Sequence, residues 1–456
     1  MSSTVVNLGT DSVSACFRHY LLPAIMGMIV KSVYVIADLI FIGQSEGSAG
    51  LAAINIAIPY FTFMFAVAMA IGVGGSALMA IRFGEGRKEE GLKMFQQAFS
   101  LTAIIMALLT IFTLLNLNSI AFLFGANEEL LPLVSDYLGT LTMFAVPYGV
   151  GWAMSSFVRN DGNPKLVMMA MMGSACTNVF LDWLFLFPFG WGMKGAALAT
   201  GLAQLVALGT LLLHFRRPNR ELQLKLVLPE WDSVKLLFRN GVPTFVMESA
   251  VGIVIMVSNW VMLDLGGNLF VSVFTIAVNC TWSVILLIYG VGQAAQPIIS
   301  FNHGAGFSHR VQEIIKRGFG LATVIAFALS LAVMILAEPI VGLFVDKPPI
   351  ELLSLGAHAL RLYALAFVPL AVSLMTVTLY QSVAKAAYST LISLSRALAL
   401  PLAGLFLLPA LFSTDAIWYN LIMAEMITAV ISVYCLKRFW SKLCGNAAES
   451  SVILST

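Results

Sequence analysis

The most constraining feature of this sequence is a succession of long, nearly uninterrupted apolar segments. A helix that crosses a bilayer needs about 20 predominantly apolar residues, and these segments reach that length. They lack the alternation over about ten residues that marks the strands of outer-membrane barrels. Of the 456 residues, 59% are apolar and only 11% are charged, whereas soluble domains carry about 25% charged residues. We therefore expect an all-α polytopic membrane protein.

Twelve apolar segments can be delimited as transmembrane helices. A polar interval from His214 to Arg239, rich in Lys and Arg, separates the sixth from the seventh. It divides the chain into an N-terminal lobe (1–215), a linker (216–239), a C-terminal lobe (240–437) and a tail (438–456). The expected helices are 17–41, 52–81, 95–117, 131–154, 164–188, 194–214, 240–264, 270–300, 316–338, 354–381, 387–410 and 415–437.

The distribution of basic residues predicts the orientation, because cytoplasmic loops are enriched in Lys and Arg. If the N-terminus is cytoplasmic, all but five of the 25 Lys and Arg residues fall on or beside the cytoplasmic side. The linker, the tail and both termini are then cytoplasmic. The five exceptions are Lys31, Lys194, Lys347, Arg361 and Arg396.

The two halves resemble each other at an offset of about 220 residues, the separation of Pro23 from Pro243. Six helices per half is an even number, so the halves share one orientation. We therefore predict two six-helix bundles related by a pseudo-two-fold axis along the membrane normal, a common plan for secondary transporters. The other matches, in the same order, are 72–74 with 290–292, 84–86 with 304–306, 123–124 with 343–344, and 146–147 with 368–369.

The first half carries a polar cluster that the second lacks. Asn178 and Asp182 are four residues apart and lie on one face of a helix, and Asp38 is a second acid inside an apolar segment. Ionisable residues within a membrane usually mark an ion or proton pathway. In the repeat register, Asp38 aligns with Ser258, Asn178 with Leu400 and Asp182 with Gly404. We therefore predict a coupling site in the first lobe.

Tyr137 and Thr200 are candidate oxygen donors from the fourth and sixth helices, although such residues often hydrogen-bond within their own helix or lie at an interface. Asp38 could instead be an interfacial acid, and Asp182 a structural one. Two nearby carboxylates can share a proton, and with the amide and hydroxyl oxygens they could also hold a sodium ion. The residues leave H⁺ and Na⁺ open, and we expect no other metal or cofactor.

Lys31 and Glu248 fall at similar depth in the first and seventh helices. They could pair across the lobes, line the substrate cavity, or have independent structural roles. Glu425 and Arg396 are also charged at membrane depth, and the sequence assigns them no partner.

Several short motifs are spread over the chain: Ala37–Gly43, Arg82–Gly86, Arg159–Lys165, Asn178 with Asp182, and Gln296-Pro297 leading to Asn302–Gly306. With these motifs the chain resembles the multidrug and toxic compound extrusion (MATE) family over nearly its full length. The branch with coupling acids in the N-terminal lobe is the most similar, since the tenth helix (354–381) has no acid for a complete C-lobe sodium site. The resemblance implies a cation site at Asp38, Asn178, Asp182, Thr200 and Tyr137.

We therefore expect a monomeric exporter of cationic, lipophilic drugs in the bacterial inner (plasma) membrane, working by H⁺- or Na⁺-coupled antiport. Its expected partners are these small molecules and membrane lipids, and not nucleic acid. A flippase for lipids or lipid-linked sugars is the alternative, although few cations are available inside the membrane for a pyrophosphate head group. An enzyme is disfavoured, because the five histidines form no His-x-x-His or Glu-x-x-His arrangement and no catalytic constellation.

Overall fold

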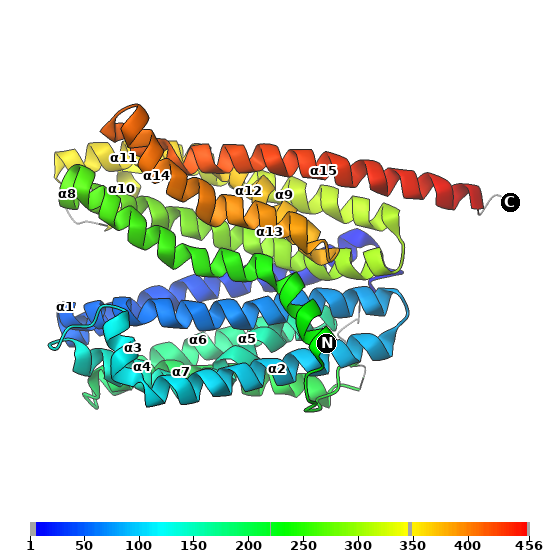
Figure 1. The fold of residues 1–456 in the computed structure, drawn as a ribbon, viewed down its shortest axis with the longest axis horizontal. Helices are drawn as coiled ribbons and strands as arrows, with labels where there is room; N and C mark the ends of the chain where they lie inside the picture. Colours follow the sequence, from blue (N-terminus) through cyan, green and yellow to red (C-terminus); the bar gives the residue numbers. More distant parts are fainter. Residues whose placement is uncertain (1–5, 219, 345–348, 454–456) are drawn as a thin grey trace.

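Two long helical elements, α1 (Val13–Gly84) and α8 (Trp231–Gly304), begin the two lobes and lie against each other. The computed structural model describes residues 6–218, 220–344 and 349–453, and Figure 1 shows the two lobes side by side. Each long element comprises two spans joined at a glycine with positive φ: Gly47 (φ 65°, ψ −154°) and Gly267 (φ 62°, ψ −154°). Glycine adopts this conformation without a steric penalty. The two turns are 220 residues apart (267 − 47), which matches the predicted repeat.

Nine helices of the described chain are long and apolar enough to cross a membrane, and two bent pairs raise the number to 11. Since α8 is counted once but contains two spans, the total is twelve. The predicted twelve-helix fold is confirmed. The other first-lobe elements are α2 (Lys88–Leu115), α3 (Leu117–Leu123), α4 (Leu131–Thr142), α5 (Ala145–Asn160), α6 (Pro164–Leu186), α7 (Gly192–Leu212) and the 3₁₀ turn η1 (Leu213–Arg216).

The second lobe follows the same order after α8, and its apolar core also includes residues from the first turns of α1. Its last helix continues well past the predicted end at 437, into the segment predicted as a tail. The elements are α9 (Ser308–Ile335), α10 (Ala337–Phe344), α11 (Ile350–Leu365), α12 (Phe367–Ser382), α13 (Ala386–Leu394), the π-helical turn η2 (Ser395–Ala399), α14 (Leu400–Leu411), the 3₁₀ turn η3 (Thr414–Tyr419) and α15 (Asn420–Ile453).

Two helices predicted as continuous, 131–154 and 354–381, are broken in the structure. The chain bends by 55° between α4 and α5 and by 43° between α11 and α12. Pro147 and Pro369 lie in the first turn after each bend. Proline lacks an N–H group, and its ring clashes with the carbonyl four residues earlier, so a straight helix through these positions is disfavoured. The same break in both lobes is a further sign of their common plan.

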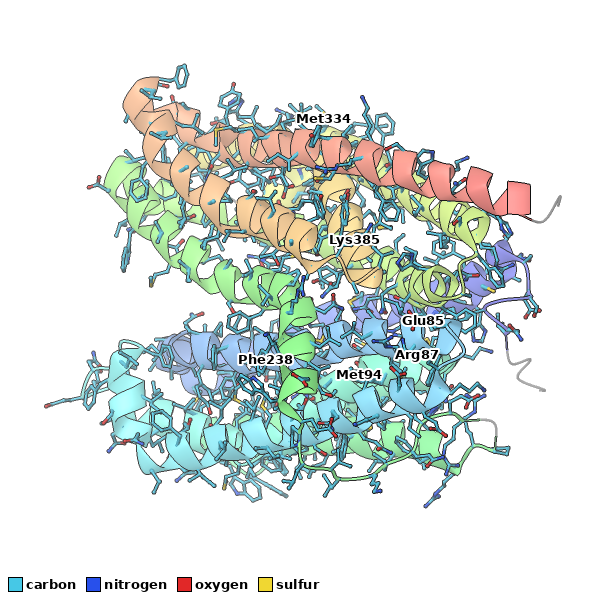
Figure 2. All side chains as sticks on the ribbon, turned by 45° about the vertical axis from the view of Figure 1, so that its right-hand side comes forward. Glu85, Arg87, Met94, Phe238, Met334 and Lys385 are labelled. Atoms are coloured by element: carbon cyan, nitrogen blue, oxygen red, sulfur yellow. The ribbon has the colours of Figure 1, made fainter. Side chains whose placement is uncertain are left out.

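The lobes meet most closely at the ends of α1 and α8. A Cβ atom placed on Gly84 would lie 2.0 Å from the carbonyl oxygen of Phe301, and one placed on Gly304 would lie 2.0 Å from that of Ile81. Both the glycines and their partners are 220 residues apart, so each contact is the counterpart of the other. The pseudo-two-fold axis therefore passes between these ends. Figure 2 shows Glu85 and Arg87 at this junction.

The segment between the lobes (217–218 and 220–230) is an extended strap held on the first lobe. On α2, the Gln97 side-chain oxygen accepts the Glu230 N–H (2.7 Å) and the Ser100 hydroxyl accepts the Val227 N–H (3.0 Å). The helix α8 begins at Trp231, nine residues before the predicted start at 240 (240 − 231). Its first turns still pack on the first lobe, where Leu237 is part of the core, and Figure 2 shows Phe238 on the part that crosses to the second lobe.

Asp161 fixes the start of this strap. It lies directly after α5, and its carboxylate accepts the backbone N–H groups of Glu221 (3.2 Å) and Leu222 (3.3 Å). The Nε2 atom of the buried His214 lies 2.7 Å from the same carboxylate. One side chain thus joins α5, the end of the first lobe and the strap.

Asp161→Ala is therefore expected to loosen the strap. Hydrogen bonds to a charged group contribute about 1.5–3 kcal/mol each, so the exposed Arg220 should be cut by trypsin at least about tenfold faster in the purified protein. Glu128→Ala, which removes an exposed acid far from the strap in sequence, is the control and should leave the cleavage rate unchanged. Equal cleavage of Asp161→Ala and wild type would show that the strap does not depend on Asp161.

Candidate coupling site

Asp38 on α1 and Asp182 on α6 are brought together in the first lobe. They lie 144 positions apart in the sequence (182 − 38), yet their carboxyl groups are close enough in the structure to influence each other electrostatically. Asp182 is fully buried, at 0% exposure. A hydrogen bond between two carboxyl groups requires that one of them carries a proton. Two neighbouring buried carboxyls can in general share one proton.

Asn178 lies one turn earlier on α6, and its side chain is a neighbour of Asp182. Its amide nitrogen donates to the Thr200 hydroxyl on α7 (3.2 Å). That bond fixes the direction of the amide and leaves Asn178 Oδ1 as an acceptor. The structure therefore brings four of the five predicted residues into one contiguous set, three of them acids or amides and one a hydroxyl.

Four oxygen atoms of this cluster are buried without a donor in good hydrogen-bond geometry among the described residues: Asp38 Oδ1, both oxygens of Asp182, and Asn178 Oδ1. Buried polar atoms are nearly always satisfied, and exceptions require an explanation such as an ion or a catalytic role. A group of unsatisfied acceptors around two carboxyls has the chemistry of a proton or hard-cation site.

Tyr137 lies beside the cluster on α4, buried to 6% exposure. Its phenol interacts electrostatically with both Asp38 and Asp182, and its ring packs edge-to-face on Phe61. The sequence prediction omitted Tyr34, which also interacts with Asp38. Tyr34 is four residues before Asp38 on the same helical face, a spacing that could have identified it.

In the second lobe, an amide and a glycine occupy the positions that Thr200 and Asp182 occupy in the first lobe. Asn420 corresponds to Thr200 at an offset of 220, and its side-chain oxygen would lie 2.0 Å from a Cβ atom on Gly404, the counterpart of Asp182. Asn420 is held there by a bond from its amide to the Pro401 carbonyl (3.1 Å). An acid at position 404 would therefore collide with Asn420, so the second lobe has no space for a counterpart of Asp182.

Lys31 and Glu248 form no direct ion pair in the described structure, although they interact electrostatically at longer range. The Lys31 ammonium lies over the rings of Phe65 and Trp152, while Glu248 accepts a hydrogen bond from Tyr289 (3.2 Å). Each of the two side chains has its partners within its own lobe, and the two line separate cavities.

The two cavities differ in size and chemistry. The first-lobe cavity, of about 40 Å³, is lined by Lys31, Tyr34, Trp152, Ser155, Ser174 and Gln204, with apolar residues between them. The second-lobe cavity, of about 170 Å³, is lined by Glu248, Trp282, Tyr289, Arg396, Asn420 and Glu425, again with apolar neighbours.

Arg396 and Glu425, to which the sequence assigned no partner, form a buried ion pair at 2.9 Å with side-chain exposures of 8% and 3%. The Ser373 hydroxyl donates to the same carboxylate (2.7 Å). Arg396 lies in η2, where one extra residue per turn changes the direction of the side chains. Such π-helical turns frequently occur at functional sites. A charge of each sign at membrane depth in adjacent helices was the only sequence signal for this pair.

The fold and the intramembrane polar cluster define a class: a two-lobed polytopic membrane transporter built from an internal repeat. Residues 23–184 and 243–405 match the MatE family. These two ranges cover one repeat each and together more than half of the chain. The chain belongs to the MatE family.

Similar proteins agree with this membership. The multidrug export protein MepA of Staphylococcus aureus (strain MSSA476) is 25% identical over 436 residues, covering 94% of this chain and 95% of MepA. MepA of Staphylococcus haemolyticus (strain JCSC1435) is 24% identical over 96% of both chains. A solved multidrug resistance MATE family transporter of the MOP superfamily, in an outward-facing conformation, has the same fold. Its TM-score is 0.88, with 23% identity, covering 98% of this chain and 100% of that one.

Proposed function

We propose that this protein is a secondary active multidrug exporter, in which entry of a proton or sodium ion drives the outward movement of cationic, lipophilic compounds. The observation that carries the proposal is the set of four donor-less oxygens around Asp38 and Asp182. Ionisable groups in a membrane protein are expensive to bury and are commonly part of an ion pathway. The related MepA proteins are multidrug export proteins by name, which supports the substrate class.

The proposed orientation places both termini and the strap in the cytoplasm of a bacterial plasma membrane, as the distribution of Lys and Arg favours. The junction of Gly84 with Gly304 then closes the cytoplasmic end, and the conformation is outward-facing. Each cavity is formed within one chain, so we propose that a monomer is sufficient for transport. Both Lys31 and Arg396 already have aromatic or acidic partners, which does not favour a flippase for pyrophosphate-linked lipids.

Ethidium efflux from everted vesicles, under separately imposed proton and sodium gradients, tests the function and identifies the ion. In everted vesicles the cytoplasmic face points outwards, so export appears as uptake into the lumen. Vesicles that contain the protein should accumulate ethidium when one of the two gradients is imposed, and vesicles without the protein should not. A response to the proton gradient alone would favour a shared proton on the two carboxyls. The absence of gradient-driven transport under both conditions would overturn the proposal.

A further inference from the structure

The ammonium group of Lys31 occupies a corner formed by two aromatic rings. Its nitrogen lies 4.4 Å from the centre of the Phe65 ring and 4.9 Å from the centre of the Trp152 ring. The rings are nearly perpendicular, at 89°, with their centres 5.0 Å apart. Both faces of the corner therefore present their negative π surface to the same cation.

This corner has the chemistry of a binding site for organic cations. A cation within about 6 Å of an aromatic centre gains about 0.5–2 kcal/mol, and aromatic cages are a common way of recognising quaternary ammonium groups. Lys31 forms no ion pair in the described structure, so the rings are its principal partners. A lysine side chain that bends onto aromatic rings inside a membrane protein takes the position that a bound cation would need.

A cavity of about 40 Å³ adjoins Lys31 and Trp152, and it would have to widen to take the rest of such a ligand. Ser155 and Gln204 contribute polar groups to its lining, and Met171 is one of its apolar and flexible residues. Methionine adapts its shape to different partners, as a site for several compounds requires. A lipophilic cation could place its charge on the rings and its apolar groups in this cavity once Lys31 had moved away.

The position of Lys31 links the corner to the coupling site. Lys31, Tyr34 and Asp38 occupy positions i, i+3 and i+7 of α1, which share one helical face. Seven residues of helix span about 10 Å. A movement of α1 that accompanies ion entry at Asp38 and Asp182 would therefore also move the Lys31 ammonium relative to the rings.

We propose that the corner of Phe65 and Trp152 binds the cationic group of the exported compound, and that Lys31 is a built-in competitor for it. The lysine fills the corner in the conformation described here and so prevents the released compound from binding again. This inference rests on the proposed function, since it assigns a place to the substrate of that exporter.

The test measures binding of tetraphenylphosphonium to the purified full-length protein in detergent by isothermal titration calorimetry. Lys31→Gln should tighten binding about 2- to 30-fold, the range that corresponds to the loss of a competing cation–π contact. Lys31→Arg, whose side chain still fills the corner with a cation, is the matched control and should bind like wild type. Weaker or unchanged binding in Lys31→Gln would overturn the proposal.

Removal of a positive charge could by itself favour a cationic ligand, so the same change is made in a Trp152→Leu background. If the rings form the site, the gain from Lys31→Gln should fall below about twofold there, because residues in contact give non-additive effects. A gain that persists without Trp152 would refute the proposal and indicate simple charge repulsion. Phe65→Leu serves as the background if Trp152→Leu does not fold.

Binding does not depend on a gradient, so this test is independent of the transport assay. Failure of the binding test together with normal ethidium efflux would reject competition by Lys31 and leave the proposed exporter function intact.

Discussion

Asp182→Asn is expected to reduce gradient-driven ethidium efflux to the background level of vesicles without the protein. The change keeps the size of the side chain and removes its charge, so the contact with Asp38 can no longer share a proton or hold a cation between two carboxylates. Asp38→Asn should have the same effect for the same reason. The measurement is the initial rate of ethidium transport in everted vesicles, at equal amounts of folded protein as judged by size-exclusion chromatography.

Asp136→Asn is the matched control for this prediction. Asp136 lies in the same lobe, on α4, but is exposed and pairs with Lys194 at 3.2 Å. Exposed ion pairs contribute about 0–1 kcal/mol, so efflux should remain close to that of wild type. Near-normal gradient-driven efflux in both Asp38→Asn and Asp182→Asn would show that the carboxyl pair is not the coupling site.

Glu425→Ala is expected to lower the free energy of unfolding by about 3–5 kcal/mol, because it leaves the guanidinium of Arg396 buried without its counter-charge. Ser373 would lose its acceptor at the same time. The loss should appear as a lower midpoint of thermal unfolding in detergent and as a smaller yield of monodisperse protein.

Two comparisons separate the ion pair from a general packing defect. Replacing both partners, as Arg396→Met with Glu425→Leu, should restore most of the stability, since apolar pairs of similar volume often equal or exceed a buried ion pair. Glu338→Ala breaks the exposed pair with Arg361, at 3.2 Å, and should cost less than about 1 kcal/mol. A double variant as unstable as Glu425→Ala would argue that Glu425 contributes through its shape and not through its charge.

The repeat was the most productive sequence signal, because it rests on residues whose backbone roles are fixed. Pro147 and Pro369 break their helices in both lobes, and Gly84 and Gly304 form two equivalent contacts between the lobes. The residues at Gly47 and Gly267 complete the pattern, although the alignment of matching motifs did not include them. Proline and glycine constrain the backbone locally, so their positions could be compared directly between the halves.

Side-chain partners were much less accessible from the sequence. Phe65 and Trp152 are aromatic residues in apolar helices, and nothing in the sequence distinguishes them there from packing residues. The ion pair of Arg396 and Glu425 depends on a π-helical turn that no local pattern predicted. The Lys31–Glu248 alternative also remained open until the structure placed the two charges in separate cavities.

The sequence by itself determined the class of protein. Long apolar segments require membrane helices, the basic loops favour one orientation, and the repeat requires two related lobes. It also determined that Asp38, Asn178 and Asp182 are exceptional, since polar groups inside the membrane are costly. Only the tertiary structure decided that the two acids meet, because a helix that is apolar nearly all round does not specify which face it turns towards its neighbours. The rotation and crossing of α1 and α6 make that choice, and they bring two distant carboxyl groups into one site.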